Sequence, residues 1–310
     1  MLQSRRRNSV FLTDLQDFPS FTSEDFSVTI DVRYLSEKSK KKAEEELNET
    51  EEVKEEALRK FSELIQCEDN LVLPHDNRPF MLKFLRARQF NVDASFNLMR
   101  NYFKFKQEFP EVFQGVVPSE CAYIYAMNAA IISPKKDQFG QTVLMGIAEK
   151  YDPNIATPME FIAAFWVVGE GLLMEPESQV NGFVGVLDCK GFSYQHFKKI
   201  TLTLIKLMIR LARDVVPGIP RRVHILNQNY YVNILYKIVK PFLPQEYIDM
   251  IHFHGENLEE LHEFIPKECL LERFGGTIKE PAITQEEYRN FLEKFDAEYR
   301  ALNELGYKNT

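Results

Sequence analysis

The chain has 310 residues, of which 45% are hydrophobic and 27% charged, and its net charge is -8. These values are typical of a folded globular protein that builds a sizeable core. The acidic balance excludes nucleic-acid binding through overall charge, so an anionic surface has to meet a local basic patch. The four cysteines are far apart and form no CxxC pair, which indicates free thiols in a reducing compartment.

Two features of the sequence predict a cytoplasmic protein. Arg5, Arg6 and Arg7 lie near the start, but no apolar segment follows them, which argues against a signal peptide. The longest apolar stretch, residues 161–174, is about half of a membrane span and contains Glu170. It is therefore interpreted as a buried helix.

The first third of the chain is predicted to be an arm followed by a helical domain. Residues 1–36 lack sustained periodicity and are predicted to be disordered. From residue 37 to about 66, apolar residues recur at helical spacing, with Glu56 and Lys60 as a supporting i,i+4 pair. Residues 78–113 indicate two more helices, separated near Asn91, a favourable N-cap. The helical domain is assigned to residues 37–117.

From residue 118 to 279, strands and helices alternate. Apolar, β-prone segments occupy residues 123–132, 142–148, 182–187, 223–226 and 251–254. Helices are predicted at 157–174, 194–213, 230–240 and from Asn257, and Thr157, Pro158 and Glu160 form a capping box. This alternation predicts an α/β domain with a mainly parallel sheet, and residues 280–310 are predicted to form a C-terminal helix.

The sequence carries no catalytic fingerprint. It has no phosphate-binding loop, no GxGxxG, no GxSxG and no HExxH. His252 and His254 share one face of a strand, but no third ligand has suitable spacing, so they are assigned to hydrogen bonding and no metal site is predicted. Asp188 follows an apolar strand and is assigned to a turn or cap. We therefore predict a binding protein that is not an enzyme and uses no cofactor.

Several ordered motifs carry a resemblance to a known family. Residues 84–90 read FLRARQF, 179–182 QVNG, 223–227 VHILN, 251–255 IHFHG and 274–276 FGG. Their order resembles the CRAL-TRIO lipid-binding proteins, in particular the branch of tocopherol and retinaldehyde carriers and clavesins. The resemblance spans residues 50–277. It implies a helical N-domain packed on an α/β pocket domain, which encloses one hydrophobic ligand beneath a helical gate and exchanges it at membranes.

The resemblance and the periodicity together propose a set of residues that line the pocket. On the strand at 182–187, alternate residues share one face, and the helices contribute apolar stripes. Core packing is the alternative for each of them. The proposed set is Phe165, Gly169, Phe183, Gly185, Leu187, Ile200, Leu204, Met208, Leu211 and Val223.

The gate is assigned to the helix at 230–240. Tyr231, Leu235 and Ile238 form one helical stripe, and a second face of the helix is also apolar. A lid that covers a cavity and touches a bilayer has this pattern, although a fully buried helix has it too. By the resemblance, Tyr194 and Phe197 join the membrane-facing patch.

The chain departs from the carriers that it resembles. In those proteins a basic cleft binds phosphoinositide headgroups, and Arg86, Arg88 and Arg221 match its basic positions. The phosphoinositide site is assigned to these three and to Arg222, which matches no expected basic position. Ile219 and Asn97 replace two further basic positions, so we expect weak or altered phosphoinositide dependence. Phe165 and Gly169 replace small hydroxyl residues of the tocopherol carrier, so a carotenoid, retinoid, sterol or phospholipid fits equally well.

The sequence thus predicts a monomeric, cytoplasmic and peripherally membrane-associated protein that binds and transfers one hydrophobic lipid-like ligand. Two alternatives stay open. One is a phosphoinositide-sensing trafficking adaptor that recruits partners through residues 1–35. The other is a hydrolase or isomerase that acts within the pocket through Asp188.

Overall fold

The computed structural model describes residues 20–23, 26–29, 34–73, 77–113, 115–280 and 293–308. The predicted disordered arm is corrected in part. β1 (Ser20–Ser23) and β2 (Phe26–Thr29) form an antiparallel pair, in a segment where aromatic, Thr and Val residues favour extended backbone. The predicted arm at residues 1–19 lies outside the described residues.

A helical N-domain follows. Its helices are α2 (Glu37–Leu47), α3 (Glu51–Cys67), α4 (Arg78–Ala87), α5 (Val92–Glu108) and α6 (Pro110–Phe113). The helical periodicity at 37–66 covers two helices, because Asn48 adopts φ 61° and Thr50 caps the second one. Asn91 caps α5, as predicted.

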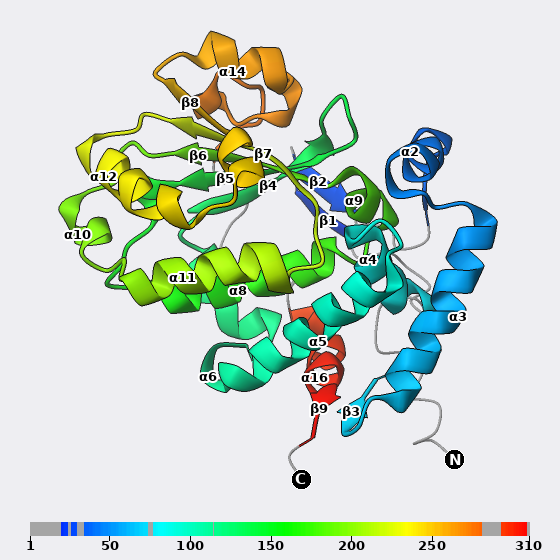
Figure 1. The fold of residues 1–310 in the computed structure, drawn as a ribbon. Helices are drawn as coiled ribbons and strands as arrows, with labels where there is room; N and C mark the ends of the chain where they lie inside the picture. Colours follow the sequence, from blue (N-terminus) through cyan, green and yellow to red (C-terminus); the bar gives the residue numbers. More distant parts are fainter. Residues whose placement is uncertain are drawn as a thin grey trace.

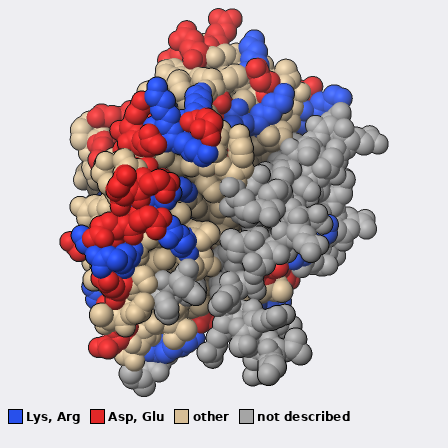
Figure 2. Space-filling view, turned by 90° about the vertical axis from the view of Figure 1, so that its right-hand side faces the viewer, with Lys and Arg blue, Asp and Glu red and all other residues tan. Residues whose placement is uncertain are grey.

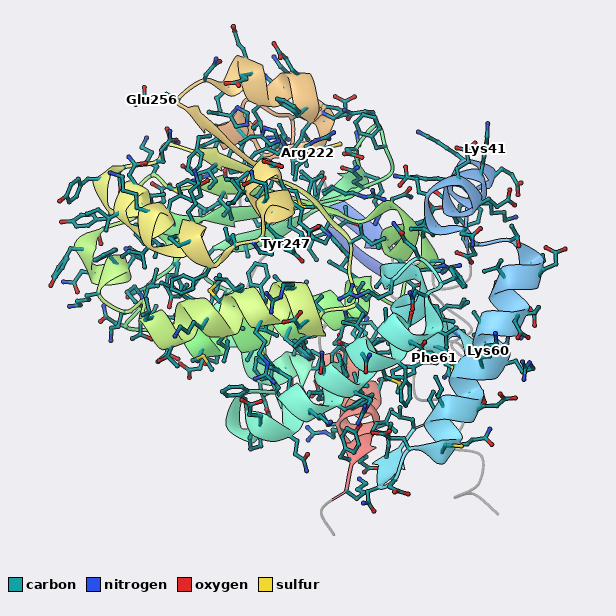
Figure 3. All side chains as sticks on the ribbon, in the orientation of Figure 1. Lys41, Lys60, Phe61, Arg222, Tyr247 and Glu256 are labelled. Atoms are coloured by element: carbon teal, nitrogen blue, oxygen red, sulfur yellow. The ribbon has the colours of Figure 1, made fainter. Side chains whose placement is uncertain are left out.

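The N-domain separates its charged face from its core. Acidic and basic side chains are intermixed on the face that carries α2 and α3 (Figure 2), and the predicted pair of Glu56 and Lys60 lies there at 3.1 Å. Within α3, Lys60 points to solvent and Phe61 points toward α4 and α5 (Figure 3). Phe61, Phe84 and Tyr102 are fully buried in one core cluster. Their burial stabilises the domain by about 1.5–3 kcal/mol for each large side chain.

The pocket domain is built on a five-stranded sheet in the order β4-β5-β6-β7-β8. The strands are β4 (Ala130–Lys136), β5 (Thr142–Ile147), β6 (Phe183–Asp188), β7 (Pro220–Leu226) and β8 (Ile251–Gly255). β4 and β5 are antiparallel, and the remaining pairs are parallel. The predicted α/β fold with a mainly parallel sheet is confirmed.

Helices cover both faces of the sheet (Figure 1). α8 (Pro158–Leu172) and α11 (Leu202–Arg210) lie along one face, and α14 (Leu258–Phe264) packs on the other, where β6 contributes Val184. The capping box of Thr157 and Glu160 starts α8 as predicted. The other α-helices of this domain are α7 (Ala122–Tyr125), α9 (Pro176–Asn181), α10 (Tyr194–Phe197), α12 (Tyr230–Val239) and α13 (Gln245–Asp249).

One long predicted helix is wrong. Residues 194–213 form α10, a break at 198–201, α11 and a π-helical turn at Leu211–Val215. The break arises because the Thr201 side chain accepts a hydrogen bond from Leu204 N and so caps a new helix. The apolar periodicity runs through the break and conceals it.

Two features tie the domains together. Lys83 Nζ of α4 lies 3.1 Å from Glu170 Oε2 of α8, and both side chains are almost fully buried. The C-terminal segment returns to the N-domain, where β9 (Gly306–Tyr307) pairs with β3 (Leu71–Val72). The predicted C-terminal helix appears as α16 (Asp296–Asn303), and residues 281–292 of that prediction lie outside the described residues.

Candidate ligand-binding site

An apolar cavity of about 370 Å³ lies at the carboxyl ends of the parallel strands, between the sheet and helices α8 and α12. This volume falls within the usual range of ligand pockets. The sheet contributes Gly146, Ile147, Leu187, Ile225 and Phe253, α8 contributes Phe161 and Phe165, and α12 contributes Val232, Leu235, Tyr236 and Val239. Loop residues, among them Tyr151, Phe192 and His196, close the remaining sides.

Two polar side chains of this wall, Tyr151 and His196, are already hydrogen-bonded, and Asp188 lies at its edge. Tyr151 donates its hydroxyl hydrogen to Ala156 O at 2.8 Å, and both ring nitrogens of His196 have partners, Ser193 and Tyr151 O. Burial raises the pKa of Tyr151 to about 12 and that of the Cys189 thiol to about 11. The cavity therefore favours an uncharged hydrocarbon surface.

Three residues that the sequence proposed line this cavity. Phe165 and Leu187 come from the proposed pocket set, and Leu235 comes from the proposed gate. The aromatic residues Phe161, Phe192 and Phe253 were missed. Phe161 lies one helical turn before Phe165, with ring centroids 5.1 Å apart, so the i,i+4 spacing was the available signal.

The other proposed strand residues lie away from this cavity. Phe183, Gly185 and Val223 share the predicted face of the sheet but occupy its amino-terminal half, whereas the cavity lies at the carboxyl ends. A Cβ on Gly185 would meet the Val223 methyl groups at an ordinary 3.9 Å. On α8, a Cβ on Gly169 would meet nothing within 4 Å.

The residues proposed around α11 are also not among those that line this cavity. Ile200 lies in the break before the helix, Leu204 is buried, and Met208 is 50% exposed. Leu211 instead belongs to the core cluster that α11 shares with the N-domain. The residues of the predicted continuous stripe are thus divided between the break, α11 and the π-helical turn.

α12 covers one side of the cavity and is lightly held. Its inward stripe is Val232, Leu235, Tyr236 and Val239, which is rotated by about one residue from the predicted stripe. Tyr236 packs on Phe253 of β8, with ring centroids 4.9 Å apart. Asn229 caps the helix and donates its Nδ2 hydrogen to Phe192 O at 2.6 Å.

The outer surface of this region exposes rings and lysines. The ring of Tyr231 of the predicted gate lies tilted against those of Tyr194 and Phe197 of α10, at 6.1 and 5.8 Å between centroids. Tyr230 is 72% exposed, Tyr194 is 58% exposed, and Ile238 is also exposed. Exposed Lys198 and Lys199 follow α10, and Lys237 lies on α12.

Two arginines of the proposed basic cleft already have acidic partners. Arg86 is buried and donates two hydrogen bonds to the Glu49 carboxylate, at 2.8 and 2.6 Å, and a third to Gln179. Arg221 binds Glu46 at 3.0 Å and two backbone carbonyls. The acidic partners lie on α2 and just after it, so two of the four arginines are already neutralised.

Arg88 and Arg222 are placed differently. Arg88 donates to the carbonyls of Ala87 and Arg213. The Arg222 guanidinium lies over the rings of Phe139 and Phe264, at 5.8 and 5.9 Å from their centroids. These two guanidinium groups have no carboxylate partner within the described part of the chain.

His252 and His254 form a stacked cluster with His224 on the α14 side of the sheet. His224 Nδ1 and His254 Nε2 lie 2.8 Å apart, and the His252 ring stacks on His224. Among the described residues, no group of three metal-binding side chains is placed to hold an ion. In the same residues, no helix combines the length and the apolar character needed to cross a bilayer.

Asp188 closes a turn, as assigned. Its Oδ1 accepts hydrogen bonds from Lys190 N at 2.9 Å and from Asn227 Nδ2 at 2.8 Å. The carboxylate thus joins the loops that follow β6 and β7.

Comparison with known proteins places this fold in a family. The model of the CRAL/TRIO domain matches residues 126–276, and that of the CRAL/TRIO N-terminal domain matches residues 34–101. Clavesin-1 of Pongo abelii is 30% identical over 246 residues, which cover 79% of this chain and 70% of that protein. Clavesin-2 of Homo sapiens is 28% identical over 246 residues, which cover 79% and 75%. The solved structure of Sfh5 covers 84% of this chain and 98% of its own, with 16% identity and a TM-score of 0.48. The chain therefore belongs to the CRAL-TRIO family and resembles its clavesin branch.

Proposed function

We propose that this protein encloses one hydrophobic, lipid-like molecule in the apolar cavity and exchanges it at a membrane surface. The observation that carries the proposal is the cavity wall, which is hydrocarbon and aromatic on the sheet, α8 and α12. Removing apolar ligand surface from water contributes about 25 cal/mol per Å², so an enclosed hydrocarbon needs few polar contacts to be held.

α12 is the proposed gate. It supplies four cavity residues on one side and exposes Tyr230 on the other, and of its own residues only Val232 is buried. Exposed rings next to lysines suit the interface of a bilayer, where aromatic rings and basic side chains are both stabilised. Movement of α12 would open the cavity directly onto that surface.

The test is native mass spectrometry after incubation with a total lipid extract, followed by release and identification of the bound species. We expect one apolar species per chain. Leu187→Asp places a carboxylate in the cavity wall and should abolish retention, because an unpaired charge in an apolar site costs several kcal/mol.

Leu202→Asp is the matched control. Leu202 is 50% exposed and Leu187 is 41% exposed, but Leu202 does not line the cavity. This variant should retain cargo like the unchanged protein. An unselective scatter of phospholipids, or equal retention by both variants, would contradict the proposal.

A further inference from the structure

A second hollow lies beside the apolar cavity and has the opposite chemistry. This polar cleft has a volume of about 880 Å³, and its lining includes Asp188, Lys190, Asn227, Gln228, Glu256 and Arg273. These residues follow β6, β7 and β8 or pack against their ends. The carboxyl ends of parallel strands are where α/β proteins usually bind their ligands.

The two hollows meet along the ends of the strands. Asp188 lines both of them. After β5, Ala148 lines the apolar cavity and the next residue, Glu149, lines the polar cleft. At β7, Ile225 lines the cavity and Asn227 lines the cleft. A ligand with one apolar part and one polar part can therefore occupy both.

The floor of the polar cleft is fixed by internal bonds. Asp188 joins the Lys190 backbone to the Asn227 side chain, as described above. Arg273 donates from Nη1 to Glu149 at 2.8 Å and from Nε to Glu280 at 2.7 Å. These groups are preorganised and largely satisfied by one another.

The rim of the polar cleft has side-chain groups that are available to a ligand. Within the described part of the chain, Lys190 Nζ and the Glu256 carboxylate take part in no hydrogen bond or ion pair. Gln228 accepts a bond from Gly255 N through Oε1, which leaves its NH₂ group for a ligand. Glu256 lies at the outer edge of the molecule, at the end of β8 (Figure 3). The rim thus offers both donors and acceptors.

The charges and residue types of the cleft narrow the class of ligand. Three carboxylates, those of Glu149, Asp188 and Glu256, face two cations, those of Lys190 and Arg273, so an anionic headgroup is disfavoured. None of the described residues that line the cleft is aromatic, so there is no ring cage for a quaternary ammonium group. A hydroxyl group both donates and accepts, and it matches this mixed rim.

We propose that the polar cleft binds the neutral, polyhydroxylated headgroup of an amphipathic lipid, a sugar or a polyol, whose tail occupies the apolar cavity. The inference rests on the proposed function, because the tail needs that cavity. It goes further by naming the chemistry of the head. Hydrogen bonds that Lys190 and Gln228 donate and that Glu256 accepts select this head over a bare hydrocarbon.

The experiment compares four probes with the same octyl chain: octyl glucoside, octanol, octyl sulfate and octylphosphocholine. Octanol is used below its solubility limit and the other three below their micellar concentrations. Isothermal titration calorimetry measures their dissociation constants with the full chain. We expect octyl glucoside to bind about tenfold more tightly than octanol, the effect of one or two additional net hydrogen bonds. The sulfate and the phosphocholine should bind less tightly than the glucoside.

A variant localises the effect. Lys190→Ala combined with Glu256→Ala removes two side chains that have no partner in the described residues, so the fold should persist. This variant should lose most of the advantage of the glucoside and bind octanol unchanged. Lys198→Ala combined with Glu259→Ala is the matched control, since both residues are exposed and outside the cleft, and it should keep the advantage.

The outcomes separate the two proposals. Octanol binding equal to octyl glucoside, tighter binding of the sulfate or the phosphocholine, or an advantage that survives the cleft variant would each overturn the headgroup assignment and leave the cavity standing. Failure of all four probes, octanol included, would overturn the proposed function and this inference with it.

Discussion

His224 has the most unusual environment of any histidine in the described chain. It is fully buried on β7, and its neighbours are His252 and His254 of β8, Phe264 of α14 and Arg222 of its own strand. Glu260 of α14 lies 3.2 Å from His254 Nδ1. Burial first, and then the neighbouring imidazoles, lowers the pKa of His224 to about 3. In the unfolded chain the same group takes up a proton near pH 6.5.

This difference predicts how stability depends on pH. Because only the unfolded chain binds the proton between pH 6.5 and 3, stability is fully present above that range and is lost as the pH falls through it. By pH 5 the loss from His224 is about 2 kcal/mol. Urea denaturation of the unchanged protein at pH 8 and pH 5 should show this loss in addition to that of other groups. In the His224→Phe variant, the free energy of unfolding should fall by about 2 kcal/mol less between pH 8 and pH 5 than in the unchanged protein. An identical fall in the two proteins would contradict the prediction.

At the scale of elements, the gate depends on the outer face of α12 and α10. Replacing Tyr230 and Tyr194 by Glu substitutes a charged side chain for each aromatic ring. Both positions are mostly exposed, so the fold and the cavity should persist. Transfer of a fluorescent lipid between vesicles should slow by about tenfold if the rings contribute about 1.4 kcal/mol of membrane contact. Native mass spectrometry should show unchanged cargo.

The matched control for this prediction lies far from the gate. Val72 on β3 is 47% exposed, and Val72→Glu should leave the transfer rate unchanged. Equal slowing by Val72→Glu, or no slowing by the tyrosine variant, would assign membrane contact to another surface.

The same elements show what sequence reasoning reached. Features that depend on neighbouring residues alone were predictable, such as the capping box of Thr157. The alternation of strands and helices likewise predicted the mainly parallel sheet. The break before α11 was not, because Thr201 caps a helix inside an uninterrupted apolar period. The site was only partly predictable, because a period of two identifies the inward face of β6 but does not say that Leu187 meets the cavity and Phe183 does not.

At the scale of the whole molecule, charge argues against strong attraction to phosphoinositides. The net charge is -8. Arg86 forms an ion pair with Glu49, and Arg221 forms one with Glu46. These pairs were invisible in the sequence, because each joins residues that are at least 37 positions apart. We expect binding to phosphoinositide vesicles and to neutral vesicles to differ by less than about fivefold, the equivalent of one surface ion pair.

A single substitution tests the cause. Glu46→Gln frees Arg221 and should raise the phosphoinositide preference in a liposome sedimentation assay. Glu45→Gln, on the same helix and paired with Lys41, should not. A strong, salt-sensitive preference in the unchanged protein would show that Arg88, Arg222 or other basic groups suffice.

The return of the C-terminal segment has a consequence for synthesis. Leu302 is buried in the core of the N-domain, and β9 completes a small sheet with β3. Residues 293–308 leave the ribosome only after the entire pocket domain has been made. The first domain to emerge therefore cannot finish its own core until the second one is complete. Such contacts, distant in sequence, slow folding because a long loop has to close first. During synthesis, the apolar surface of the N-domain that later covers Leu302 stays exposed. When residues 293–308 pack onto it, they also fix the finished pocket domain to the N-domain.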